Sequence, residues 1–220
     1  MSGPYALMWS GGKDCTLALQ RATAKGLLIT ILVNIHDPQT GRVRFHATDV
    51  DLIAAQARSL GVSLMPVASP WSDMDSRLRA TFASLKKDGY AGVIFGDIHL
   101  ADVRAWYEDR VRAAGLEHVE PLWGEDPGAL VDEFIGSGGR AVLTCVDTTK
   151  LGPEWLGRVP DPSFVAQIRA AGCDPSGENG EFHTFAFDGP RFSTPVEWVA
   201  GELATDGRFA QLQLSASSSS

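Results

Sequence analysis

The chain has 220 residues, 44% of them hydrophobic and 21% charged, and its 19 Lys and Arg against 27 Asp and Glu give a formal net charge of −8. This composition indicates a globular protein with one large domain, or one domain and a smaller appendage, and argues against general nucleic-acid binding. The N-terminus lacks the basic and apolar regions of a signal peptide, and no apolar run approaches the roughly 20 residues that cross a bilayer. We therefore expect a cytoplasmic protein without a membrane partner.

Three cysteines, Cys15, Cys145 and Cys173, lie far apart and show no CxxC spacing. An odd and scattered set of cysteines favours neither a disulfide framework nor a structural zinc site. A reducing compartment is the simplest setting for such a chain.

Short apolar runs alternate with helical patterns through the first two thirds of the sequence. The predicted strands cover residues 5–9, 28–35, 64–68, 91–95 and 141–146. The predicted helices cover residues 16–25, 50–60, 74–87, 101–114 and 128–136. Apolar strands that alternate with amphipathic helices predict an α/β fold, in which a Rossmann-like, doubly wound parallel sheet is covered on both faces.

After residue 150 the sequence becomes rich in Gly and Pro, and residues 181–192 alternate like a hairpin closed by Asp188 and Gly189. This change predicts a smaller α+β region at the C-terminal end. The expected divisions are residues 1–120 for the Rossmann-like domain, 121–214 for the C-terminal region and 215–220 for a disordered, Ser-rich tail.

The stretch SGGKDC, residues 10–15, joins the first predicted strand to the first predicted helix. A glycine turn before a helix aims unpaired backbone N–H groups and the positive end of the helix dipole at one point, which favours an anion. The two glycines permit close approach of a ligand, the serine adds a hydroxyl, and Lys13 brings a full charge. Asp14 either caps the helix or reaches a phosphate through a metal ion.

Two common phosphate motifs do not fit this loop. Gly12 and Lys13 are followed by Asp14 rather than by Ser or Thr, and GGKDCT is not GxGxxG, so a Walker A loop and a dinucleotide fingerprint both fail. The loop instead resembles the SGGxDS pyrophosphate loop of the N-type ATP pyrophosphatases, with Cys15 in place of the usual Ser. Cys15 is open to two interpretations, a passive small residue or a thiol made reactive by the helix dipole.

A second motif, GENGEFHT, places Glu178, Glu181 and His183 close together. Carboxylates and an imidazole at this spacing can act as acid and base, ligate a metal or bind an amine. If residues 181–187 form a strand, Glu181 and His183 share one face and look into the same cleft. A polar turn with a solvated hairpin face is the structural alternative.

The two motifs, together with FHATDVDLIAAQARSLGV, IFGDI, GLEHVEPLWGED and EWLGR, resemble the diphthine–ammonia ligase (diphthamide-synthesis ATP-binding) family from about Leu7 to Phe192. The resemblance implies an adenine-nucleotide hydrolase-like (HUP-like) domain that binds ATP and Mg²⁺, followed by a substrate-binding region. It implies an ATP-dependent, amide-forming ligase: a substrate carboxylate is adenylated with release of pyrophosphate, and ammonia or an amine then displaces AMP. The acceptor would be diphthine on the translocating elongation factor in an archaeal or eukaryotic source, and a different molecule in a bacterial one.

The resemblance also implies roles for individual residues, while the metal ligands stay unassigned. The implied nucleotide-binding residues are Ser10, Gly11, Gly12, Lys13, Asp14, Cys15, Asn34, His36, Gly96 and Asp97. The implied catalytic residues are Lys13, Asp14, Glu178, Glu181 and His183. The implied substrate-binding residues are Arg158, Glu178, Glu181, His183 and Thr184. Three positions keep a structural alternative: Asp97 as a helix-capping residue, His46 as a local hydrogen-bonding residue and Trp106 as part of an amphipathic helix.

Two other functions stay open at this point. An RNA-base-modifying adenylating enzyme would favour a basic face and catalytic cysteines, which the net charge and the scattered cysteines oppose. A nucleotide-binding sensor would bind ATP without turnover, and such proteins often dimerise, so a homodimer stays open as well.

Overall fold

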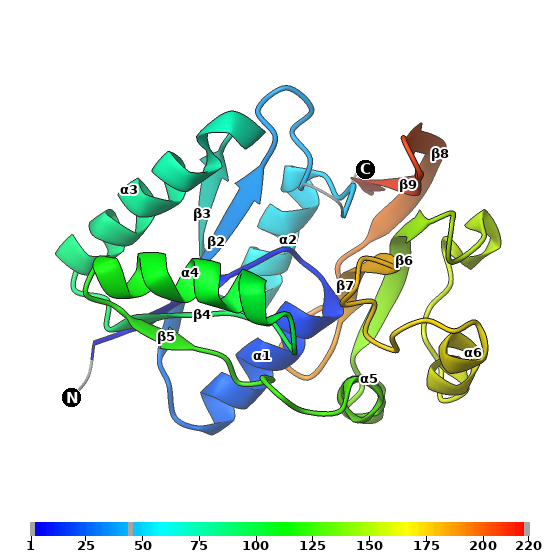
Figure 1. Ribbon diagram of the computed structural model, residues 1–220, viewed down its shortest axis with the longest axis horizontal. Coiled ribbons are helices and arrows are strands. Elements are labelled where there is room, and N and C mark those ends of the chain that lie inside the picture. Colours follow the sequence, from blue (N-terminus) through cyan, green and yellow to red (C-terminus); the bar gives the residue numbers. More distant parts are fainter. Residues whose placement is uncertain (1–2, 44–45, 218–220) are drawn as a thin grey trace.

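The computed structural model describes residues 3–43 and 46–217, and its first half is built on a parallel sheet. The strands of this sheet are β1 (Tyr5–Met8), β2 (Ile29–His36), β3 (Ser63–Ala68), β4 (Gly92–Ile94) and β5 (Glu117–Val119). They lie side by side in the order β3-β2-β1-β4-β5, and every pairing is parallel (Figure 1). The Rossmann-like prediction is therefore confirmed.

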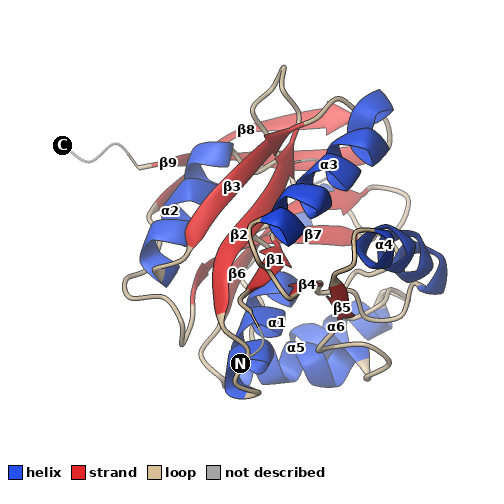
Figure 2. Cartoon of the chain, turned by 90° about the vertical axis from the view of Figure 1, so that its left-hand side faces the viewer, coloured by secondary structure: helices blue, strands red, loops and turns tan. Residues whose placement is uncertain are grey.

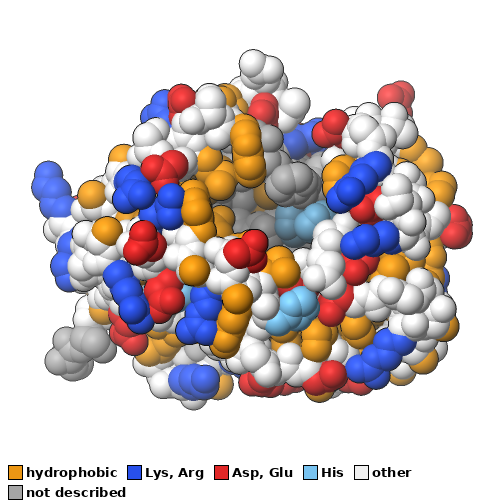
Figure 3. Space-filling model, viewed as in Figure 1, with side chains coloured by type: hydrophobic (Ala, Val, Ile, Leu, Met, Phe, Trp, Pro, Cys, Tyr) orange, Lys and Arg blue, Asp and Glu red, His pale blue; other side chains and the backbone are white. Residues whose placement is uncertain are grey.

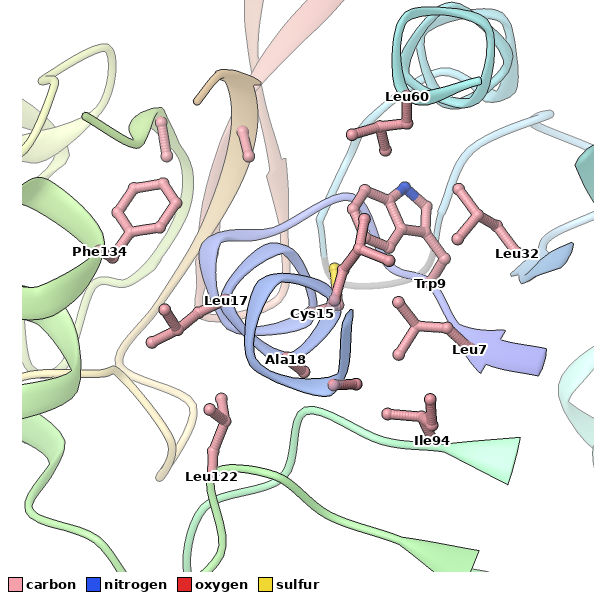
Figure 4. Close-up of a cluster of buried hydrophobic side chains, with 14 of the residues drawn as sticks. Leu7, Trp9, Cys15, Leu17, Ala18, Leu32, Leu60, Ile94, Leu122 and Phe134 are labelled. Atoms are coloured by element: carbon pink, nitrogen blue, oxygen red, sulfur yellow. The ribbon is translucent and has the colours of Figure 1, made fainter. Parts of the chain in front are cut away.

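Helices cover both faces of the parallel sheet (Figure 2). The helices are α1 (Lys13–Ala24), α2 (Val50–Leu60), α3 (Met74–Lys87) and α4 (Ala101–Ala113), with a short 3₁₀ turn η1 (Trp71–Asp73) before α3. Alternate strand residues point to opposite faces. Leu7, Leu32 and Ile94 pack with α1 and α2, as Figure 4 shows for the first of these helices, whereas Ala6, Val33 and Val93 pack with α3 and α4.

The boundaries of the best-predicted helix follow from its own sequence. The Asp49 carboxylate accepts a hydrogen bond from the backbone N–H of Asp51 at 2.9 Å, which caps the start of α2. At the other end Gly61 adopts a left-handed conformation with φ +66°, which ends the helix. The observed bounds of α2 equal the predicted range.

The second half of the chain forms a separate antiparallel sheet. Its strands are β6 (Arg140–Asp147), β7 (Phe182–Asp188), β8 (Trp198–Asp206) and β9 (Phe209–Ala216), in the order β7-β6-β9-β8. The helical segments of this half are α5 (Pro127–Gly136), η2 (Pro153–Trp155) and α6 (Phe164–Ala170). One face of the sheet packs on Leu52 of α2 and the other on α5 and α6, so α2 lies between the two sheets.

Three expectations about this half are wrong. Residues 141–146 belong to the antiparallel sheet and not to the parallel one. Residues 181–192 do not form a hairpin, because β7 pairs with β6 and the hairpin is made by β8 and β9. Strand β9 continues to Ala216, two residues into the segment expected to be disordered, and residues 218–220 lie outside the described part of the chain.

No helix within residues 3–43 and 46–217 is long and apolar enough to cross a membrane.

The end of β4 lies directly against the first turn of α1. A Cβ built on Gly96 would come within 2.9 Å of the backbone N of Cys15 and 3.0 Å of the carbonyl carbon of Asp14. Since both neighbours are backbone atoms, neither can rotate away. The absence of a side chain at Gly96 thus sets how closely the segment after β4 approaches the first turn of α1.

We predict that Gly96→Ala lowers the free energy of unfolding by about 1 to 3 kcal/mol, because the added methyl group forces backbone segments apart. Denaturant titration measures this change. The matched control is Gly136→Ala at the end of α5, where a Cβ would meet nothing within 4 Å. The control should be neutral or more stable by up to about 1 kcal/mol, since Ala favours a helix over Gly. Equal stabilities of the two variants would contradict the close-approach argument.

Candidate active site

A cavity of about 860 Å³ opens at the carboxyl ends of the parallel strands. The chain runs outward from β1 to β3 on one side and from β4 to β5 on the other, so the strand order reverses between β1 and β4. Open α/β sheets bind ligands at such a reversal point. The cavity is visible as a hollow near the centre of the face in Figure 3, with histidine atoms inside it.

The cavity wall has a polar part and an apolar part. The polar part comprises Ser10, Lys13, Asp14, Cys15, His46, Gly96, Asp97, Asp102, Ser176, Gly177, Glu178, His183 and Thr184. The apolar part comprises Met8, Trp9, Val33, Ile35, Val43, Trp71, Met74, Phe95, Leu100, Val103, Trp106, Tyr107 and Phe182. Such a division suits a ligand with both charged and aromatic or aliphatic groups.

The free edge of strand β7 holds the glycine loop, residues 10–15. The N–H of Ala186 donates to the carbonyl of Gly11 at 2.8 Å, and the N–H of Lys13 donates to Thr184 Oγ1 at 3.1 Å. Gln56 of α2 is fully buried and donates from Nε2 to the carbonyls of Gly11, at 2.9 Å, and of Ala186, at 2.5 Å. These bonds fix the start of α1 against an edge strand whose polar groups would otherwise be unpaired.

Lys13 joins the glycine loop to the second motif. Its side chain is only 3% exposed, and Nζ donates to the carboxylate of Asp14 at 2.8 Å and to the carbonyl of Ser176 at 2.5 Å. The ammonium group therefore lies between the first turn of α1 and the loop that precedes β7.

Four carboxyl groups, from Asp14, Asp97, Asp102 and Glu178, lie in the polar part of the cavity, and the pKa values of three of them are raised. Burial raises the pKa of Asp14, although the Lys13 ammonium opposes this rise. Burial and then the charge of Asp14 raise the pKa of Asp97 to about 6 and that of Glu178 to about 7. Glu178 also accepts a hydrogen bond from the N–H of Ile98 at 2.9 Å. A carboxyl group with a pKa near neutrality can exchange a proton at physiological pH.

The two glutamates of GENGEFHT have different surroundings. Asp174 accepts from the N–H groups of Ser176, at 2.8 Å, and Glu178, at 3.3 Å, which folds residues 174–178 into a tight turn. Glu181 is 4% exposed, lies 3.6 Å from Lys150 Nζ and accepts from the N–H of Asp174 at 3.3 Å. Glu178 therefore lines the cavity, whereas Glu181 packs behind the turn.

Two histidines from distant segments meet over the glycine loop. His46 lies on the connection between β2 and α2, His183 lies on β7, and their ring centroids are 4.7 Å apart. Nδ1 of His46 is 3.0 Å from the carbonyl oxygen of Thr184. A Cβ built on Gly12 would lie 3.1 Å from Cε1 of His46, so this imidazole packs on the loop itself.

Most of the predicted site residues line the cavity, and some do not. The residues that line it are Ser10, Lys13, Asp14, Cys15, Gly96, Asp97, Glu178, His183 and Thr184. Gly11 and Gly12 shape the loop behind the wall, and Asn34 is fully buried and donates to the carbonyl of Trp9 at 2.8 Å. His36, Glu181 and Arg158 also lie off the wall, the last bonded to Gln167 and stacked on Trp155 at 4.1 Å. The expectation that Glu181 and His183 face one cleft is wrong, because β7 starts after Glu181.

The environment of Cys15 favours the passive interpretation. Burial raises the pKa of this thiol to about 11, and Sγ donates to the carbonyl of Gly12 at 3.1 Å. A protonated, buried thiol is a poor nucleophile.

Sequence reasoning missed several parts of the cavity wall. Trp71 and Met74 come from η1 and the start of α3, and Ser176 contributes a backbone carbonyl. No local pattern marks these residues as functional, since their role depends on where the strands end. Trp106, which the sequence placed on an amphipathic helix, is partly buried and also lines the cavity.

Within the described residues no three His, Cys, Asp or Glu side chains are arranged to hold a metal ion. Magnesium often binds through one or two carboxylates together with substrate phosphates. The carboxylates of Asp14 and Asp97 fit that mode of binding, in which the phosphates complete the coordination.

Comparison with known proteins places both halves of the chain. The diphthamide synthase N-terminal domain matches residues 3–118, and the diphthamide synthase C-terminal domain matches residues 126–214. The diphthine–ammonia ligase of Bos taurus is 24% identical over 225 residues, which cover 91% of this chain and 84% of that protein. The diphthine–ammonia ligase of Homo sapiens is 24% identical over 216 residues, which cover 87% of this chain and 81% of that protein. With both domain models matched in order along the chain, the protein belongs to the diphthamide synthase family.

Proposed function

We propose that the protein is an ATP-dependent, amide-forming ligase of the diphthine–ammonia ligase type. The observation that carries the proposal is the joint cavity, which the glycine loop and Glu178 both line. Lys13 of the loop donates to the carbonyl of Ser176, 163 residues further along the chain, at 2.5 Å, and this contact brings the two motifs together. We assign ATP binding to residues 1–120 and acceptor binding to residues 121–214, with Arg158 and Thr184 on the acceptor side.

The residues present fit a nucleoside triphosphate. Gly11 has φ +84°, and its Cβ would lie 2.6 Å from Ile53 Cδ1, so only glycine gives the loop this path next to a ligand. The start of α1 directs its dipole at the polar part of the cavity, which suits the β and γ phosphates. The apolar part, with Val33, Ile35 and Trp71, suits the adenine base.

The first step joins the acceptor carboxylate to the α phosphorus. A carboxylate oxygen attacks, the bond to the β phosphate oxygen breaks, and pyrophosphate leaves with the electron pair. Lys13 and the loop N–H groups stabilise the charge that develops on pyrophosphate. Mg²⁺, if held by Asp14 and Asp97 together with the phosphates, would supply further charge neutralisation. If the Lys13 ammonium leaves the carbonyl of Ser176 to bind the phosphates, this step also changes the contacts of the turn of residues 174–178.

The second step transfers ammonia to the acyl adenylate. Ammonium must lose a proton before its nitrogen can attack the acyl carbon. The bond from the acyl carbon to the phosphate oxygen then breaks, AMP leaves with the electron pair, and the adduct nitrogen gives its surplus proton to the leaving phosphate as the amide forms. Glu178, with a pKa near 7 in a cavity that also holds Asp97, is suited to accept that proton. The protonated Glu178 returns the proton to solvent.

Thiol chemistry of the kind used in some RNA base modification has little support. Burial raises the pKa of Cys145 to about 12 and raises that of Cys173, and neither residue lines the cavity. The three thiols are therefore unsuited to carry sulfur or to act as nucleophiles at neutral pH.

Product analysis tests the function directly. Labelled ATP, Mg²⁺ and ammonium are incubated with the protein and with candidate acceptors, diphthine-bearing elongation factor and small carboxylates among them. AMP and pyrophosphate in equal amounts, formed only with an acceptor, are the expected products. ADP and phosphate would exclude adenylation, and bound ATP without any turnover would favour the sensor.

We predict that Lys13→Met lowers kcat for pyrophosphate release by at least about 100-fold, because the variant loses the charge next to the leaving group. Pyrophosphate release under saturating ATP measures the effect. Lys25→Met, at the far end of the same helix, is the matched control and should retain activity. Because Lys13 is buried beside Asp14, thermal unfolding of both variants is recorded, and Asp14→Asn provides a second test of the same site. Normal turnover in a folded Lys13→Met protein would exclude the assignment.

We predict that Glu178→Gln raises the free energy of unfolding relative to the wild type by more at pH 8 than at pH 5. The folded pKa of about 7 lies above the ordinary value of 4.5, so the stability that neutral Glu178 contributes is complete below about pH 4.5 and is lost as the pH rises through 7. The difference in free energy of unfolding between variant and wild type should grow by about 1 to 2 kcal/mol from pH 5 to pH 8, because partial solvent exposure of Glu178 weakens the effect of its raised pKa. Urea titrations at both pH values measure it.

The control for this experiment is Glu202→Gln on the exposed strand β8, which makes the same charge change away from the cavity. Its pH–stability curve should follow that of the wild type. A Glu178→Gln curve parallel to that of the control would show that the Glu178 carboxyl is ordinary and unsuited to the proton transfer.

A further inference from the structure

The geometry of the two cavity histidines points to a role that the proposed chemistry does not yet use. We propose that His46, packed against His183, is a ligand of the pyrophosphate part of the nucleotide and takes up one proton from water when the triphosphate binds. This inference rests on the proposed nucleotide site and adds a residue and a proton to it.

The position of His46 is the first support. Gly12 of the glycine loop lies against the imidazole, since a Cβ on Gly12 would come within 3.1 Å of Cε1. A phosphate held by the loop N–H groups therefore lies next to this ring. His183 lines the same cavity from β7, beside Thr184, whose hydroxyl accepts from the N–H of Lys13.

The hydrogen bond of His46 fixes which ring nitrogen faces the ligand. A carbonyl oxygen can only accept, so the 3.0 Å contact with Thr184 requires the hydrogen on Nδ1. In the neutral ring Nε2 then carries the lone pair. It cannot donate to a phosphate oxygen until it gains a proton, and a ring that gains one becomes a charged donor.

The backbone holds His46 in this position. Ala47 adopts φ +55°, a left-handed conformation that a residue other than glycine adopts only under constraint. Arg42 donates to the carbonyl of Ala47 at 2.7 Å, and the N–H of Ala47 donates to the carbonyl of Val43. Strain maintained by such contacts is common where a side chain must be presented to a ligand.

The charges around His46 and His183 explain why the imidazoles stay neutral in the free protein and why one of them is protonated only when the nucleotide binds. Among the described residues, the charged or titratable groups that shift the pKa values of the two rings are Lys13 from α1 and, for His183, the ring of His46, while the carboxyl groups of Asp14, Asp97, Asp102 and Glu178 line the same cavity. Burial, and then Lys13, lower the pKa of His46 to about 4, and burial, His46 and Lys13 lower that of His183. Several phosphate charges beside the ring reverse this balance. Two imidazolium rings at 4.7 Å repel each other, so the pair gains one proton and not two.

Nitrogen NMR of the full-length protein with labelled histidine tests the proposal at pH 7.5. In the free protein the His46 Nε2 resonance should have the position of a lone-pair nitrogen, and Nδ1 that of a protonated one. Addition of α,β-methylene ATP with Mg²⁺ should move Nε2 to the protonated position. His46→Asn assigns the resonance, and a neutral Nε2 in the saturated complex would overturn the inference.

Calorimetry of the same titration gives a second, independent readout. Heats measured in two buffers of different ionisation enthalpy should give about one more proton taken up by the wild type than by His46→Asn. The variant, which cannot gain the charge, should bind the nucleotide about 10-fold to 100-fold more weakly. His99→Asn is the control, because His99 is exposed and lies outside the cavity wall; it should bind like the wild type.

The possible outcomes distinguish failure of the proposed His46 role from failure of the proposed ligase function. Nucleotide binding with equal affinity and equal proton uptake in the wild type and His46→Asn overturns the histidine role and leaves the ligase proposal standing. A wild-type protein that binds no nucleotide overturns both.

Discussion

The hydrogen bond from the N–H of Ala186 to the carbonyl of Gly11 is the contact on which the rest of the site depends. An edge strand of the antiparallel sheet and a turn of the parallel sheet satisfy each other's backbone groups there, and Gln56 bonds to both carbonyls from a fully buried position. Unpaired polar groups at this depth would destabilise the fold, so the contact is maintained. Strand β7 therefore lies across the start of α1. The Thr184 hydroxyl accepts a hydrogen bond from the first N–H of this helix, and His183 lies next to the glycine loop.

This contact makes the two sheets parts of one site. The parallel sheet alone provides an anion-binding turn, which many proteins possess. The antiparallel sheet adds the turn of residues 174–178, and Lys13 connects the two through the carbonyl of Ser176. A ligase that first activates a carboxylate and then delivers an amine needs both reactions in one enclosed space, since an acyl adenylate exposed to water hydrolyses. For the proposed ligase, the joint cavity would provide that single space.

The sequence predicted those features whose physical cause lies in neighbouring residues, and it did not predict those that depend on residues far away in the chain. The bounds of α2 follow from Asp49 and Gly61, which lie next to the helix, and the parallel sheet follows from the alternation of apolar runs with helices. Helix α1, in contrast, starts at Lys13 and not at Thr16, because the hydroxyl that accepts from its first N–H belongs to Thr184, 171 residues away. The same kind of distant partner explains why β7 pairs with β6, and why Glu181 lies behind the turn that presents Glu178.

The cavity also separates charges in a way that the motifs did not reveal. The loop N–H groups and the two imidazoles gather where the glycine loop passes, whereas Asp97 and Glu178 lie at the end of β4 and on the turn before β7. The Lys13 ammonium lies between these two groups. An anion and a cation brought into this space are therefore drawn to different walls. Asp14 stands between them, paired with Lys13 at 2.8 Å and raising the pKa of both other carboxyls. A phosphate that attracts Lys13 would weaken the ion pair between Lys13 and Asp14 and leave the Asp14 carboxylate freer to bind a cation. Binding of a phosphate at the glycine loop would therefore favour binding of a cation at the carboxylates.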